Sequence, residues 1–192
     1  IMALSGAMLS SCTKNYYDCD QNAQQIKLSS EVTLSGTPRA QELIRAGQSL
    51  SLFVTPAGTP AELLYSNVML NADGSGGFTY SQNMFYPIDG RNVDFFAVHP
   101  YQAGALLGST LDFSVSPNQA AETNYLNSDL LHAFRTDVAR TSQAVSLTFS
   151  HKLSKIDFII RTADGIELNN LNSVEILNVL PSTTISPSTG VI

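Results

Sequence analysis

Apolar and polar residues alternate along many short stretches of this chain, and this period of two is the feature that most restricts its fold. In residues 145–149, the apolar Val145, Leu147 and Phe149 are separated by Ser146 and Thr148. Every second side chain of a strand points to the same face, so this spacing indicates a strand with one buried face. Further strands are predicted at residues 26–34, 50–54, 64–70, 78–80, 111–115, 156–160 and 174–176.

Turn-forming residues separate these stretches. The sequence N-A-D-G-S-G-G at residues 71–77 predicts a turn, and the short link at 151–154 predicts a hairpin between the strands on either side. Residues 93–98 form an almost wholly apolar run that stops before Pro100, as a strand buried on both faces does. Many short strands divided by such turns predict an all-β sandwich or barrel.

Two segments favour a helix instead, and one more strand is expected near the end of the sequence. Residues 41–46 predict one helical turn at most. Residues 129–140 place Leu130, Phe134 and Val138 at i, i+4 and i+8, which favours a helix. A strand is expected to begin at Val191.

Charge argues against nucleic acid as a partner. The 192 residues include ten Lys and Arg against sixteen Asp and Glu, a formal net charge of −6. Because the basic residues are scattered and outnumbered, they form no patch that would neutralise phosphates.

The first residues predict export and lipid attachment. Residues 1–11 are mostly apolar and too short to span a bilayer, and they end in small residues before Cys12, as a signal peptide does. No basic stretch precedes them, so we expect the precursor to begin earlier. Residues 9–12, L-S-S-C, resemble the bacterial lipobox, which implies a lipid on Cys12 and membrane contact through that lipid alone. Residues 12–24 are polar and predict a tether, and Cys19 is either a spare thiol or the partner of Cys12 in a very small disulfide loop.

Three stretches together resemble the fimbrillin-like (Mfa-type) family of surface lipoproteins. Residues 85–101 are similar to its Y-P-x-D-G…V-D-F-x-A-x-x-P-Y segment, residues 129–133 to its D-L-L-x-A, and residues 145–156 to its V-x-L-x-F-x-H-x-L-(S/A)-K hairpin. A weaker match begins at Thr37, where Pro38 interrupts the family's T-R-A motif and Gln48 replaces its usual acidic residue. The resemblance covers about residues 25–192.

The resemblance implies a Greek-key, transthyretin-like β-sandwich. It makes residues 25–192 the N-terminal domain of a two-domain fimbrillin, with the C-terminal domain absent from this chain. It implies a structural or adhesive subunit of cell-surface fimbriae, as stalk, tip or anchor, with no enzymatic activity and no cofactor. The location it implies is the outer membrane surface. The implied partners are other fimbrial subunits, joined by strand exchange, and host or bacterial surface ligands.

In major fimbrillins, an arginine-directed protease cuts the loop after the first strand, and a strand of the next subunit takes the vacated place. Arg39 and Arg45 are the matching candidates here, and two ordinary surface arginines are the alternative.

The remaining chemistry-bearing residues form no recognisable catalytic or metal motif. The histidines, His99, His132 and His151, lack metal-type spacing, and no serine lies in G-x-S-x-G, so no catalytic residue and no metal ligand is predicted. A triad or carboxylate pair formed only by the fold stays open, with Asp89, Asp94 and Asp112 as the acidic candidates. The turn at 73–77 lacks the further acidic ligands that calcium needs.

A surface glycan-binding lipoprotein is the alternative function. Tyr80, Phe85, Tyr86 and Tyr101 would then form an aromatic platform, although packing in the core is the other use of such residues.

Overall fold

The computed structural model describes residues 23–33, 43–161 and 171–192, and the regular secondary structure of these residues is almost entirely strand. Seven of them form one sheet in the order β1-β8-β7-β5-β2-β3-β4, and β6 and β9 form a second, two-stranded sheet. The all-β prediction is therefore confirmed, while the Greek-key, transthyretin-like arrangement stays a prediction. The strands of the large sheet are β1 (Leu28–Thr33), β2 (Ser49–Pro56), β3 (Tyr65–Ala72), β4 (Phe78–Tyr80), β5 (Val93–His99), β7 (Leu131–Val138) and β8 (Val145–His151).

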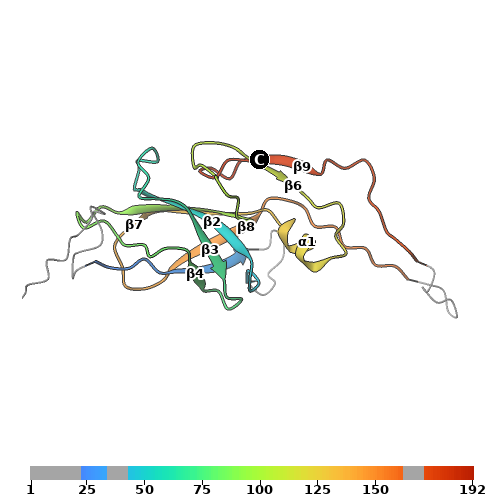
Figure 1. Ribbon diagram of the computed structural model, residues 1–192, viewed down its shortest axis with the longest axis horizontal. Helices are drawn as coiled ribbons and strands as arrows, with labels where there is room; N and C mark the ends of the chain where they lie inside the picture. The colour runs from blue at the N-terminus through green and yellow to red at the C-terminus, as the bar shows by residue number, and fades with distance from the viewer. Residues whose placement is uncertain (1–22, 34–42, 162–170) are drawn as a thin grey trace, which may run out of the picture.

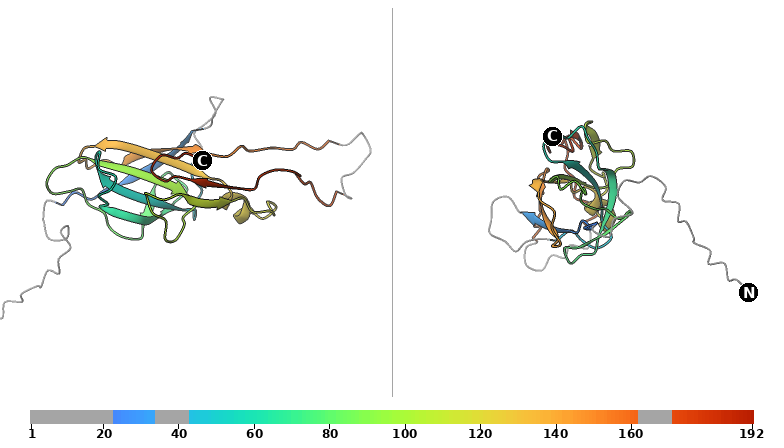
Figure 2. Two further views of the ribbon diagram at one scale, coloured as in Figure 1. Left: turned by 90° about the horizontal axis from the view of Figure 1, so that it is seen from above. Right: turned by 90° about the vertical axis from the view of Figure 1, so that its left-hand side faces the viewer.

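The large sheet curls until its two edges meet (Figures 1 and 2). All of its neighbouring strands run antiparallel except β1 and β8, which are parallel, with Leu28 opposite Val145 and Thr33 opposite Ser150. Isolated bridges join Gln25 to Phe85 and Ser29 to Gly77, so the β1 edge is bonded to the β4 side of the sheet. Curling in this way removes the free edges that an open sheet would expose.

Two hydrophobic clusters explain the burial of the strands. The cluster inside the curl includes Leu52, Phe95 and Leu147. The second cluster, with Phe53, Phe96 and residues of the small sheet, lies between the outer face of β2 and β5 and the pair β6 (Leu111–Ser114) and β9 (Ser182–Ile185). All seven residues of β5 are buried because both of its faces are covered, as the almost wholly apolar run at 93–98 predicted.

The structure confirms most of the predicted strands. Residues 50–54, 64–70, 78–80, 93–98, 111–115 and 145–149 lie in or overlap β2, β3, β4, β5, β6 and β8, and the described part of 26–34 contains β1. The predicted turn is slightly shorter than expected, because β3 continues through Ala72 and the turn occupies 73–77.

The helix predicted at 129–140 is wrong, because most of this segment forms β7. Leu130 is fully buried but Phe134 is 60% exposed, so the i, i+4 spacing does not correspond to one buried face. β7 instead places Leu131 and Ala133 in the inner core and pairs with β5 and β8. The one helix of the described residues, α1 (Glu122–Asn127), buries no residue and carries no periodic signal that would have predicted it. Of the segment 41–46, only residues 43–46 are described, and a turn begins at Ala46.

Three further strand predictions are wrong within the described residues. Residues 156–160 and 174–176 are in no strand, so the hairpin predicted through 151–154 is absent, and β8 pairs with β1 and β7 instead. Val191 also lies in no strand. We call the described residues 152–161 and 171–181 the arm, and both of its segments run away from the curled sheet in the same direction (Figures 1 and 2). Leu153 packs against the second cluster, but the other apolar residues of the arm are exposed because they lie beyond the other described strands.

Candidate functional site: the seat of the first strand

β1 lies between two neighbours that are distant in sequence, and this arrangement is the candidate functional site. We call the surroundings of residues 24–33 the seat: β8 on one side and residues 76–86 on the other. Along β1 the burial alternates, with Leu28, Ser30 and Val32 buried and Thr33 exposed. Ile26, just before the strand, is 1% exposed. One face of this segment therefore belongs to the inner core.

Residues 76–86 hold the other side of β1 through main-chain groups. The Ile26 N–H donates to the Met84 carbonyl at 2.8 Å, and the Ser30 N–H donates to the Gly76 carbonyl at 2.7 Å. The Tyr86 N–H donates to the Gln24 carbonyl at 3.0 Å. Such bonds depend on an extended main chain rather than on particular side chains, so they suit any strand that takes this place.

A tyrosine hydroxyl completes the row of acceptors. The Leu28 N–H donates to Tyr80 Oη at 2.8 Å, between the two bonds to main-chain carbonyls. Burial raises the pKa of Tyr80, and the Leu28 N–H partly opposes this effect, so the hydroxyl stays protonated. Tyr80 thus acts as a fixed acceptor for the strand.

The turn at 73–77 presents the Gly76 carbonyl to β1. The Asp73 carboxylate accepts the N–H groups of Ser75 and Gly77 at 2.7 and 2.9 Å, and these bonds lower the pKa of Asp73. Gly76 has a φ of +92°, a conformation that glycine adopts without steric cost. Asp73 therefore fixes the turn that the sequence predicted, with its Oδ1 atom accepting both backbone N–H groups.

The predicted lipid and processing residues are only partly described. Cys12, Cys19 and Arg39 lie outside the described residues. Arg45 lies in the turn before β2, where its N–H donates to Gln48 Oε1 at 3.0 Å and its carbonyl accepts the Gln48 N–H at 3.2 Å. Its guanidinium forms an exposed ion pair with Glu122 at 2.8 Å, and the preceding Ile44 is buried. Cleavage after Arg45 would require this turn to open.

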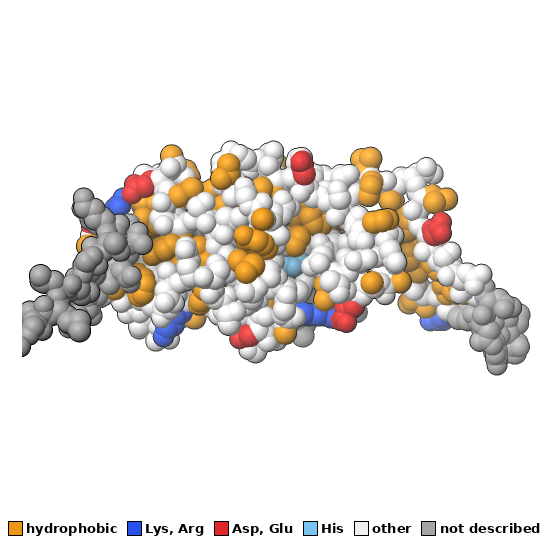
Figure 3. Space-filling view, viewed as in Figure 1, with side chains coloured by type: hydrophobic (Ala, Val, Ile, Leu, Met, Phe, Trp, Pro, Cys, Tyr) orange, Lys and Arg blue, Asp and Glu red, His pale blue; other side chains and the backbone are white. Residues whose placement is uncertain are grey.

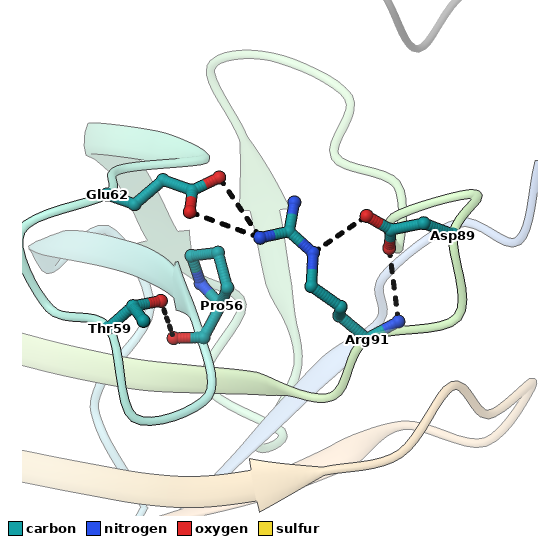
Figure 4. A network of polar contacts seen from close by, with 5 residues as sticks. All are labelled: Pro56, Thr59, Glu62, Asp89 and Arg91. Carbon is teal, nitrogen blue, oxygen red and sulfur yellow. Dashed lines mark hydrogen bonds and ion pairs between the residues drawn. The ribbon is translucent and has the colours of Figure 1, made fainter.

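The three acidic candidates do not come together. Asp89 pairs with Arg91 Nε at 2.7 Å, and Arg91 also reaches Glu62, in a surface network (Figure 4). The Arg91 N–H is the main cause that lowers the pKa of Asp89.

The other two acidic residues have separate surroundings. Asp94 is 5% exposed and accepts the N–H groups of Gly58 and Asp137 at 3.0 and 2.7 Å. Asp112 is exposed on β6. None of these positions provides the facing pair of carboxylates that acid–base catalysis uses.

The histidines support the structure. His99 Nδ1 lies 2.7 Å from the Asp129 carbonyl, and His132 Nε2 lies 2.8 Å from the Pro187 carbonyl. Burial lowers the pKa of both rings. His151 Nδ1 contacts Asp129 Oδ1 at 2.7 Å. Within the described residues, no three His, Cys, Asp or Glu side chains gather as metal ligands would.

The aromatic candidates do not form an exposed platform. Tyr86 is 1% exposed, and Tyr80 is bonded to β1. The Phe85 N–H and carbonyl both bond the hydroxyl of Tyr65, at 2.8 and 3.2 Å. These aromatics therefore hold the seat rather than present rings to a sugar.

Sequence reasoning missed the seat itself. Ser30 and Gly76 are 46 residues apart, and Leu28 and Tyr80 are 52 apart, so no local pattern joins them. The one signal that pointed to the site was the strand at 26–34 followed by two arginines.

Comparison with known proteins gives consistent matches. A family model described as fimbrillin-like matches residues 37–192. A Bacteroides uniformis protein named as a fimbrium subunit, Fim1C, is 28% identical over 131 residues, which cover 66% of this chain and 42% of that protein. The chain thus spans less than half the length of this curated relative.

Solved structures also match. One described as a cell adhesion protein from Bacteroides ovatus has a TM-score of 0.63 at 17% identity, covering 88% of this chain and 66% of its own. Another so described, from Bacteroides uniformis, has a TM-score of 0.48 at 20% identity, covering 67% and 47%. The first of these likenesses supports the fold. No described helix is long and apolar enough to cross a bilayer.

Proposed function

The chain belongs to the fimbrillin-like family, and on that premise we propose that it is a subunit of cell-surface fimbriae that assembles by β-strand complementation. The family comprises fimbrial structural subunits rather than an enzyme class, and the role proposed here is structural or adhesive, without catalysis. The observation that carries the proposal is the seat: β1 is a complete, buried strand, held mainly through its main chain, at one end of a sheet that the other strands form without it.

Complementation works if β1 leaves and a strand of another subunit enters. The sequence between β1 and β2 contains Arg39 and Arg45, so one cut there separates β1 from the rest of the sheet without touching a strand. The hydrogen bonds around Arg45 favour Arg39 as the processed residue. The vacated seat then exposes one side of β8 and the acceptors of residues 76–86, which is the geometry of β-augmentation.

We also propose that the subunit is exported as a lipoprotein of the outer membrane surface, with its lipid on Cys12. Cleavage after Arg39 would then release β1 together with the lipid, whereas an uncut subunit would remain anchored. The described sheets would be the N-terminal domain of a longer subunit, with the exposed arm packing against a second domain. What supports this extension is the match to less than half of the curated relative and the exposed apolar residues of the arm.

The assembly test uses purified chain, an arginine-specific protease and size analysis under native conditions. We expect R45A to be cut between β1 and β2 and R39A not to be cut there, and protein cut there to lose its N-terminal peptide and form higher-order species. If the cut chain retains β1 and takes up no added strand, assembly by strand complementation is ruled out. The lipid is tested by incorporation of an alkynyl fatty acid in the bacterium, which C12S should abolish and C19S should leave unchanged.

A further inference from the structure

We infer that the seat selects its strand by size at one position, and that an incoming strand must carry a small residue in the place of Ser30. Large apolar residues are required in the places of Ile26, Leu28 and Val32. This inference rests on the proposed strand complementation and names the partner: an extended segment with the pattern large-x-large-x-small-x-large.

The pattern follows from the burial of the resident strand. Ile26, Leu28, Ser30 and Val32 are 1%, 3%, 3% and 3% exposed, whereas Lys27 and Thr33 are exposed. Four alternate positions are therefore covered equally, but only three of them hold large side chains. The inner core has thus formed around a small residue in the middle of the strand.

The turn at 73–77 closes over this middle position. The Gly76 carbonyl accepts the Ser30 N–H at 2.7 Å and lies 3.4 Å from Ser30 Oγ. A Cβ placed on Gly76 would lie 3.4 Å from the Ser30 carbonyl oxygen, so the turn and the strand are in direct contact. A larger side chain at position 30 would have to displace close-packed residues, and such overpacking is destabilising.

The same row of contacts restricts the main chain of the strand. The N–H groups of Ile26, Leu28 and Ser30 all donate hydrogen bonds to acceptors within residues 76–86. Proline has no N–H, so a strand with proline at any of these positions would leave an acceptor without its partner. The restriction adds to the size rule and does not depend on side chains.

Residues 174–180 of the arm show what the rule excludes. Val174, Ile176 and Leu180 have the spacing of Ile26, Leu28 and Val32, and all three are exposed. The position equivalent to Ser30 is Asn178. An amide buried there would be larger than serine and would need partners for its polar atoms, which raises the cost of burying it. The rule thus predicts that this segment is rejected by the seat, and that N178S admits it.

The experiment measures strand capture by the full chain after one cut between β1 and β2, as the added peptide takes the seat that β1 leaves. The probes are fluorescent peptides of residues 23–33, as the natural sequence and with S30A, S30L, S30N or K27L. Two further peptides of eleven residues, 171–181, carry the arm sequence with and without N178S. The same Ser30 and Lys27 substitutions in the intact chain, followed by urea unfolding, test the size rule without strand exchange.

We expect S30A and the outward-facing control K27L to be captured within about twofold of the natural peptide, and S30L and S30N at least about tenfold more weakly. N178S should raise capture of the arm peptide about tenfold. Capture of S30L equal to that of the natural peptide, or an unfolding midpoint unchanged by S30L in the intact chain, would overturn the size rule. If no peptide is captured while S30L still destabilises the intact chain, strand complementation fails and the packing rule at position 30 survives.

Discussion

β1 and the arm are both extended segments with apolar residues at alternate positions, and their surroundings are opposite. Ile26 and Leu28 are 1% and 3% exposed, whereas Ile156 and Phe158 are 58% and 56% exposed. β1 has hydrogen-bonding neighbours on both sides, while the arm pairs with no other described strand. Figure 3 shows apolar side chains along the arm as it approaches the grey segment on the right.

The difference teaches that alternation and burial are separate properties. Alternation gives a segment one apolar face, but burial needs a neighbour that lies within reach of that face. β1 has two such neighbours because the sheet curls back to it. Beyond Leu153, the arm has none among the described residues because it leaves the sheet at the end of β8. The following predictions change one region and use the other as the control.

The largest expected effect is the loss of a core side chain from β1. L28A should lower the free energy of unfolding by about 2–5 kcal/mol, because a buried leucine leaves both lost contacts and a cavity. L177A is the matched control, since Leu177 is 74% exposed in the arm, and it should change stability by no more than about 0.5 kcal/mol. Urea denaturation of both variants measures the contrast, and similar losses would show that the arm is buried in solution.

A smaller effect is expected when the hydroxyl that holds β1 is removed. Y80F leaves the Leu28 N–H without its acceptor in a partly buried place, which should cost about 1–3 kcal/mol. Y125F is the control, because the Tyr125 hydroxyl bonds the exposed Lys155 of the arm. Hydrogen exchange of the Leu28 amide should become faster in Y80F alone. An unchanged exchange rate would mean that Tyr80 does not secure the strand.

Acid should weaken the fold through two buried histidines. Burial lowers the pKa of His99 and His132, so both are neutral in the fold, whereas histidine in the unfolded chain binds a proton near pH 6.5. The contribution of these two histidines to stability is therefore complete above about pH 6.5, and it is lost as the pH falls towards their pKa values in the folded chain. Urea midpoints at pH 7.5, 6.5 and 5.5 should decline, and H132N should reduce the decline. Equal slopes in H132N and the natural chain would contradict this.

The positions of most strands could be predicted from the sequence, but which strands pair with one another could not. Residues 145–149 and the apolar run 93–98 identify β8 and β5 because local sequence decides whether one face of a strand or both faces are apolar. β7 was misread because its spacing of four residues satisfies a helix and a strand alike, and only pairing with β5 and β8 resolves it.

The seat depends on contacts between residues about 50 positions apart, such as Leu28 and Tyr80, which no local pattern encodes. The arm shows that alternation alone does not produce a strand. The sequence predicted strands there, but the described residues supply no partner strand for them.

The smallest expected effect on stability, and the sharpest test of how β1 is released, comes from the two arginines. R45A removes an ion pair whose side chains are 60% and 72% exposed, so the unfolding midpoint should not change measurably. Because the Arg45 main chain is held by Gln48, we expect an arginine-specific protease to cut R45A between β1 and β2 at the natural rate and not to cut R39A there. Mass analysis of the released peptide identifies the cut. Release after Arg45 in R39A would show that the turn before β2 opens readily. The hydrogen bonds between Arg45 and Gln48 would then not protect Arg45 from cleavage.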